Sequence, residues 1–193
     1  MARTKDFDED EVLAKAINLF WCKGYNGTSM QDLVDALGIS RSSLYDTFGD
    51  KHQLYIKALE SYEQAETAKR NKALDKSIPA KTAIRQLLDY TLQDLISDKQ
   101  HKGCFLTNAA VENAALDKDV NTLICRNEKA LESAFYEVIL RGQKSGEITS
   151  HQDARALARF IFNSIAGIRV TGKSATDKSV FADIIRLTLS VLD

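Results

Sequence analysis

The chain has 193 residues, of which 44% are hydrophobic and 27% are charged, and its formal net charge is −1. This composition is typical of a soluble globular protein with a substantial core, and it excludes a disordered chain. No apolar run is long enough to span a bilayer, and the N-terminus lacks the apolar core of a signal peptide, so we expect a cytoplasmic protein. One proline and nine glycines leave long stretches without helix breakers, which favours an all-α fold.

The charge gives no general support for nucleic-acid binding, because acidic residues outnumber basic ones in the first sixty positions as well. Several of these acids crowd the start of the first predicted helix, which runs from about Asp8 to Lys23 and is closed by Gly24. The positive end of the helix dipole favours acids there, away from any bound DNA. Ahead of this helix, Arg3 and Lys5 form a small basic arm that we expect to contact phosphate or the minor groove.

The stretch from Thr28 to Lys51 contains two short helix signals in succession. Thr28 and Gln31 have the spacing of a capping box, which predicts that the first helix starts at Thr28. Gly38 can adopt the left-handed backbone at which that helix ends, and Ser40 can cap a second helix two residues later. Such a short connection makes two helices cross steeply, so the pattern predicts a helix-turn-helix.

The polar residues of this region are of types that bind DNA. Small serines let the second helix approach base edges, and Tyr45 lies beside them, whereas the flanking residues are placed to contact phosphate. The predicted DNA-binding residues are Arg3, Lys5, Thr28, Ser29, Arg41, Ser42, Ser43, Tyr45, Lys51 and His52.

This stretch closely resembles the DNA-binding domain of the TetR family of bacterial transcriptional regulators. The resemblance rests on Phe7, Ala16, Leu19, Phe20, Gly24, Tyr25, Thr28, Ser29, Gly38, Ser40, Ser43, Leu44, Tyr45, Phe48, Lys51 and Leu54. It implies a three-helix DNA-binding head over residues 1–60. It also implies a helical body over residues 61–193 that dimerises and binds an inducer.

Further helix signals follow along the body. Asp50 and Gln53 start a helix that connects head and body and continues towards Lys72, and Pro79 is expected in the first turn of the next helix. Later helices are expected in a short segment after Gly103, from about Asp117 to Lys144, from Asp153 to Gly172 and from Lys178 to Leu192.

The last two predicted helices carry more apolar residues than one core needs. The stripes expected to face the monomer core are Leu157, Ile161, Phe162, Ile165 and Ile168, then Val180, Ile184, Leu187 and Val191. Phe160, Phe181, Ile185 and Leu189 lie off these stripes and are expected to pack against a second copy. In the resembled family these helices form a four-helix bundle across the dimer. The alternative, that both helices only close the monomer core, stays open.

The segments KGCFLTNAAVE and GIRVTGK are similar to a branch of the same family that contains the N-ethylmaleimide reductase repressor and other regulators of electrophile and quinone detoxification. Cys104 follows Gly103 at a predicted helix N-terminus, where the dipole stabilises a thiolate. The resemblance implies that Lys173 pairs with this cysteine. A buried and inert thiol is the commoner state of a lone cysteine, so sensing through Cys104 is one of two open interpretations.

The other interpretation is a reversible ligand in an apolar cavity of the body, with Asn108, Glu112 and Asn163 as its polar groups. The three cysteines, Cys22, Cys104 and Cys125, are widely spaced and expected to be free thiols. His101 with Cys104 is at most half of a metal site, so neither a metal nor a cofactor is predicted.

The sequence therefore predicts a homodimeric repressor of the TetR type, which binds double-stranded operator DNA and is released by a small molecule or an electrophile. Two alternatives come from other classes. One is a helical adaptor that binds protein through the same head, and the other is a helical enzyme that acts on the ligand. Paired carboxylates, a nucleophile motif and a phosphate-binding glycine loop are all missing from the sequence, which disfavours the enzyme.

Overall fold

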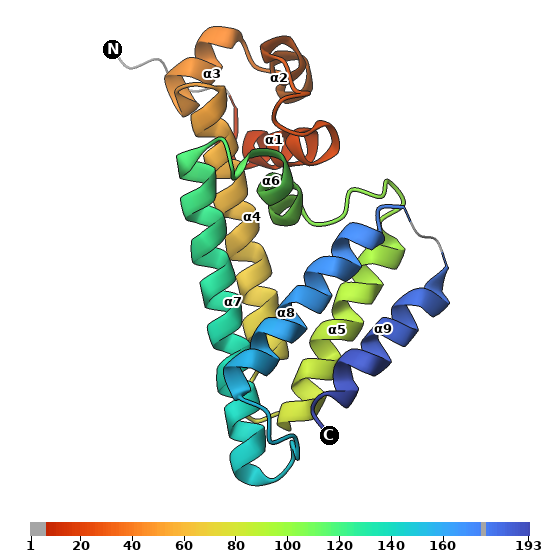
Figure 1. Ribbon diagram of the computed structural model, residues 1–193. Helices are drawn as coiled ribbons and strands as arrows, with labels where there is room; N and C mark the ends of the chain where they lie inside the picture. Colours follow the sequence, from red (N-terminus) through yellow and green to blue (C-terminus); the bar gives the residue numbers. More distant parts are fainter. Residues whose placement is uncertain (1–6, 175–176) are drawn as a thin grey trace.

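The computed structural model describes residues 7–174 and 177–193, and these residues form nine α-helices and no strand (Figure 1). The helices are α1 (Glu9–Lys23), α2 (Met30–Leu37), α3 (Arg41–Phe48), α4 (Lys51–Ala73), α5 (Ala80–Ser97), α6 (Phe105–Asn113), α7 (Lys118–Ser145), α8 (Ala154–Thr171) and α9 (Lys178–Ser190). The predicted all-α fold is confirmed. Among the described helices, none is both long and apolar enough to cross a membrane.

A small head and an elongated body share the helix α4 (Figure 1). Helices α1 to α3 form the head, and α4 runs from it down one side of the body next to the long helix α7. Helix α8 packs against α7, and α5 and α9 lie beyond it. The short helix α6 lies beneath the head and contacts α4, α7 and α8. It is therefore the body helix that is best placed to transmit a change to the head.

The start of α2 differs from the prediction by one residue. Ser29, not Thr28, is the N-cap, and it forms a reciprocal capping box with Asp32. Thr28 is buried, and its hydroxyl donates to the carbonyl oxygen of Gly24 at 2.7 Å. Because the end of α1 occupies the Thr28 hydroxyl, the next hydroxyl along the chain caps α2. The predicted end of α2 at Gly38 and the cap of α3 at Ser40 are confirmed.

Helix α5 begins one residue later than predicted, because Pro79 is its N-cap and not a member of its first turn. Proline has no hydroxyl or carboxylate with which to cap the helix. Glu147, from the loop after α7, supplies the missing acceptor, and its carboxylate receives the backbone N–H groups of Ala80 at 2.6 Å and Lys81 at 2.8 Å. This contact fixes the far end of the body.

Two hydrophobic cores are present, and their boundary does not coincide with residue 60. The first core joins the head to α4, to α6 and to the first turns of α7, whereas the second lies among α5, the rest of α7, α8 and α9. Phe105 on α6 lies 5.8 Å from Tyr55, 5.7 Å from Tyr62 and 6.3 Å from Trp21, measured between ring centroids. The head thus shares its core with α6, while a division of the chain at residue 60 stays a prediction.

The prediction for α9 is wrong in part: Ile184 and Val191 pack against the second core as predicted, but the other assignments are reversed. Phe181, Ile185 and Leu189 are buried in the second core, whereas Val180 is 39% and Leu187 57% exposed. Both stripes are apolar and both have helical spacing, so periodicity does not decide between them. The stripe that carries the largest side chain, Phe181, fills the monomer core.

We expect Phe105→Ala to lower the free energy of unfolding by about 3–5 kcal/mol, because it removes a fully buried ring from the core that joins head and body. Val111→Ala on the same helix is the matched control, since Val111 is 81% exposed. Urea unfolding at fixed protein concentration measures both variants. Equal losses would show that the core around Phe105 does not depend on this ring.

Candidate functional site

Helix α3 presents a polar face to solvent. Its apolar residues, Leu44 and Phe48, are buried against the head, while Arg41, Ser42 and Tyr45 are exposed. Tyr45 is 43% exposed, and the Arg41 guanidinium lies 6.0 Å from the centre of its ring. The Ser43 backbone N–H donates to the cap oxygen of Ser40, whose hydroxyl also hydrogen-bonds those of Ser42 and Ser43. The outward residues at the start of the helix are therefore held in a fixed arrangement.

The other predicted DNA-binding residues fall into three groups. Ser29 is exposed at the N-cap of α2 and is engaged with Asp32, and Lys51 lies with its Nζ 4.3 Å from the centre of the Tyr25 ring. Burial lowers the pKa of Lys51, with partial compensation by Glu112 and Asp32. Thr28 is buried. Arg3 and Lys5 lie outside the described residues.

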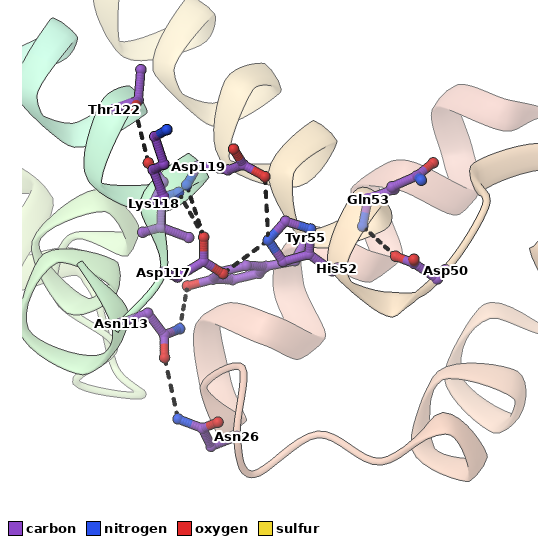
Figure 2. A network of polar contacts seen from close by, with 11 residues as sticks. Asn26, Asp50, His52, Gln53, Tyr55, Asn113, Asp117, Lys118, Asp119 and Thr122 are labelled. Atoms are coloured by element: carbon purple, nitrogen blue, oxygen red, sulfur yellow. Dashed lines mark hydrogen bonds and ion pairs between the residues drawn. The ribbon is translucent and has the colours of Figure 1, made fainter. Parts of the chain in front are cut away.

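His52 lies at the junction between head and body, and not on the face formed by α3. Figure 2 shows its ring between the two aspartates at the start of α7: Nε2 is 2.8 Å from Asp117 Oδ2 and 3.9 Å from Asp119 Oδ2. These three residues place ligand-type atoms within 4.8 Å of one another. The other carboxylate oxygen of Asp117 caps α7, so the group is accounted for by a hydrogen bond to a helix-capping carboxylate.

Three further hydrogen-bond sets fasten the head to α6. The Glu112 carboxylate accepts the backbone N–H groups of Tyr25 at 3.1 Å and Asn26 at 2.8 Å. The buried Asn113 accepts from the Asn26 side chain and donates to the Tyr55 hydroxyl (Figure 2). At the other end of α6, Trp21 Nε1 donates to the Gly103 carbonyl oxygen at 3.0 Å. The loop between α1 and α2 is thus held by the last turn of α6.

The body encloses a cavity of about 500 Å³. Apolar side chains from α5, α6, α7 and α8 form most of its wall, and the polar residues on the wall are Glu66, Arg70, Tyr90, Thr91, Thr107, Asn127, Glu128, Asn163 and Arg169. Cys104 also lines it. Such a size and lining suit a small organic molecule.

Only part of the predicted inducer set lines this cavity. Cys104 and Asn163 do, whereas Glu112 binds the head and Asn108 donates to the Lys102 carbonyl oxygen. Lys173 donates to Asn108 at 3.1 Å, so it is not the hydrogen-bond partner of Cys104. That partner is Arg169, whose Nη1 is 3.3 Å from Sγ. Arg169 precedes Lys173 by one helical turn, and this spacing was the signal in the sequence that could have identified it.

The thiol of Cys104 is buried, with 4% of the residue exposed, at the N-cap of α6. Burial acts to lower the pKa of the neighbouring Arg169. The electrostatic interactions with Cys104, Tyr62 and Glu66 outweigh this effect, so the pKa of Arg169 is raised. Cys22 and Cys125 are exposed, and all three cysteines are free, as predicted.

Comparisons with known proteins identify the architecture. The family model described as bacterial regulatory proteins, tetR family, matches residues 12–58, and the tetracyclin repressor-like C-terminal domain matches residues 80–187. The chain belongs to the TetR family. Its relatives include the regulator YezE of Bacillus subtilis, 37% identical with both chains fully covered, and the repressor ComR of Escherichia coli, 28% identical over 97% of this chain and 90% of ComR.

A solved structure of the TetR family regulator CifR, a cysteine mutant bound to double-stranded operator DNA, has a TM-score of 0.86 and 28% identity, with 97% of this chain and 98% of that chain covered. The resemblance of the head is confirmed by these comparisons. The protein is a DNA-binding transcriptional regulator of the TetR type and not an enzyme.

We expect Glu112→Ala to lower the free energy of unfolding by about 1–2 kcal/mol, because two backbone N–H groups, the partly buried one of Tyr25 and the exposed one of Asn26, lose their acceptor. It should also weaken DNA binding, since the freed loop leads directly into α2. Glu128→Ala, which changes a residue of the cavity wall, is the control. Urea unfolding and titration with operator DNA measure both effects, and an unchanged affinity in Glu112→Ala would contradict the role of this contact in placing the head.

Proposed function

We propose that this protein is a homodimeric repressor that binds a palindromic operator in the cytoplasm and leaves it when a small molecule or an electrophile reaches the body cavity. The proposal rests on the exposed polar face of α3 in the head. That head is hydrogen-bonded to α6, and α6 also lines the cavity. The repressor ComR and the operator complex of CifR support the DNA-binding half of the proposal.

On the operator, Ser42, Ser43 and Tyr45 would lie in the major groove, near base edges or the adjacent backbone. Arg41, Ser29 and Lys51 would contact phosphate, together with the arm that carries Arg3 and Lys5. The contacts made by cations contribute affinity that decreases as salt rises. Thr28 and His52 would support the head from within, since one is buried and the other is paired with Asp117.

The dimer would form through the outer faces of α8 and α9. Phe160 and Val170 are 48% and 50% exposed on one face of α8, and Val180 and Leu187 are exposed on one face of α9. Between the two α8 residues lies Gly167, where an added methyl group would meet no atom within 4 Å. An apolar face with a small residue at its middle allows close approach of a second copy.

Release would pass through α6. Leu106, Thr107, Ala110 and Val111 of this helix line the cavity, and Glu112 and Asn113 of its last turn bind the head. A ligand that displaces α6 therefore displaces the loop before α2, and with it the position of α3 relative to the other head of the dimer.

We expect Tyr45→Ala to abolish operator binding while the dimer persists, because it removes the largest exposed side chain of α3. Asp46→Ala is the control; it removes an exposed acid from the same helix and should leave affinity unchanged or raise it. Operator titration and light scattering measure the two properties. Normal affinity in Tyr45→Ala would exclude α3 as the recognition helix.

For the electrophile, we expect N-ethylmaleimide to release a Cys22→Ser, Cys125→Ser variant from the operator and to leave the same variant bound when it also carries Cys104→Ser. Because Cys104 is buried, mass spectrometry must confirm that its thiol has reacted. Modification of Cys104 without release would exclude sensing through this residue, and the search would turn to a reversible ligand.

A further inference from the structure

Of the two arginines that line the cavity, Arg169 has an acidic partner and Arg70 has none among the described residues. Glu66 lies 2.8 Å from Lys69 and 3.6 Å from Arg169, and Glu63 lies 2.5 Å from Arg126. Glu63 and Glu66 are the carboxylates that act on Arg70 electrostatically, and both are already engaged by other cations. Within the described part of the chain, no carboxylate forms an ion pair with Arg70.

Arg70 is 8% exposed and lines the cavity from the last turns of α4. Its Nη2 donates to the Thr67 hydroxyl at 3.3 Å, and its buried Nε has no hydrogen-bond partner. Burial lowers the pKa of this arginine, against the opposite effect of Glu63 and Glu66. A buried cation without an anionic partner is costly to the fold, and an anion that pairs with the guanidinium from the cavity would reduce that cost.

The surroundings of Arg70 determine what kind of anion fits. Leu131, Phe135 and Phe162 contribute to an apolar wall that would enclose most of a ligand. Among the described residues that line the cavity, Arg70 is the one unpaired cation, so a single negative charge is matched and a phosphate dianion is not. Glu128 also lines the cavity and disfavours a second anionic group. A planar carboxylate matches the fork of a guanidinium.

We propose that the cavity binds an apolar monocarboxylic acid whose carboxylate accepts hydrogen bonds from Arg70. The proposal rests on the function proposed above for the cavity and names the chemical class of its ligand. Along α4, Arg70 lies eight residues beyond Tyr62, which contacts Cys104, so roughly 12 Å of helix separates the two ends of the site. An acid held at Arg70 extends its apolar part towards α6, the helix that binds the head.

The test compares acids with their neutral amides on the full-length protein. Octanoate and 2-naphthoate, with octanamide and 2-naphthamide, are titrated calorimetrically into the wild type, Arg70→Met, Arg70→Lys and the control Lys72→Met, which changes an exposed residue of the same helix. In the wild type and the control, at least one acid should bind roughly tenfold or more tightly than its amide. Arg70→Met should lose this preference and keep its affinity for the amide, and Arg70→Lys should keep part of the preference.

A second measurement excludes a merely structural role for Arg70. Because Arg70→Met removes a buried and unpaired charge, its melting temperature without ligand should equal or exceed that of the wild type. Unfolding of this variant, equal binding of acids and amides by the wild type, no binding of any probe, or an acid preference that survives in Arg70→Met would each overturn the proposal.

Operator titration in parallel separates this inference from the function on which it rests. Binding of the acid through Arg70 without release from DNA would leave the anion site standing and refute the cavity as the site of induction. Release by a probe whose effect is unchanged in Arg70→Met would support induction through the cavity and refute the role of Arg70.

Discussion

The contact between the Glu112 carboxylate and the loop after α1 determines how the head is held. Two backbone N–H groups of that loop donate to it, and Gly24 makes the approach possible, since a methyl group there would lie 2.8 Å from Oε2 of Glu112. Gly24 also has a φ of +76°, so both its backbone and its missing side chain are required. The position of the head therefore depends on the last turn of α6, which belongs to the body.

Ion pairing separates the charged residues near the cavity that stabilise the fold from Arg70, which has no acidic partner among the described residues. Pairs such as Arg126 with Glu63 satisfy both partners, and a helix-spanning set joins Lys69, Glu66 and Arg169. Arg70 lies within this set of charges and has no acidic partner among the described residues. Departures from complete polar satisfaction in a folded protein concentrate at functional sites, because selection for stability alone would remove them. The same reasoning distinguishes Arg70 from Arg169, whose guanidinium has both a carboxylate and the Cys104 sulfur as neighbours.

Local signals allowed much of the fold to be predicted from the sequence. The caps at Asp8, Ser40 and Asp50 and the left-handed Gly38 act within a few residues, so their effects can be read from neighbouring positions. The same reasoning misassigned the cap of α2, because it did not reveal that Gly24 accepts the hydroxyl of Thr28. Contacts across long separations were not predictable in this way. Nothing near Glu112 in the sequence indicates a partner 87 residues earlier, and the cavity that Arg70 lines is formed with residues of α5, α6, α7 and α8.

Helix α9 shows that amphipathic periodicity alone cannot assign a helix face to the monomer core, since Phe181, Ile185 and Leu189 are buried there against prediction. Two apolar stripes on one helix require two apolar surroundings, and the sequence does not say which belongs to the monomer. Since Phe181 fills the core, Val180 and Leu187 are left exposed, and we propose that they contact a second copy. On α8, Asn163, Gly167 and Val170 border the cavity and lie on the face proposed for the dimer. A ligand in the cavity would then contact both the helix that binds the head and a helix of the proposed dimer interface.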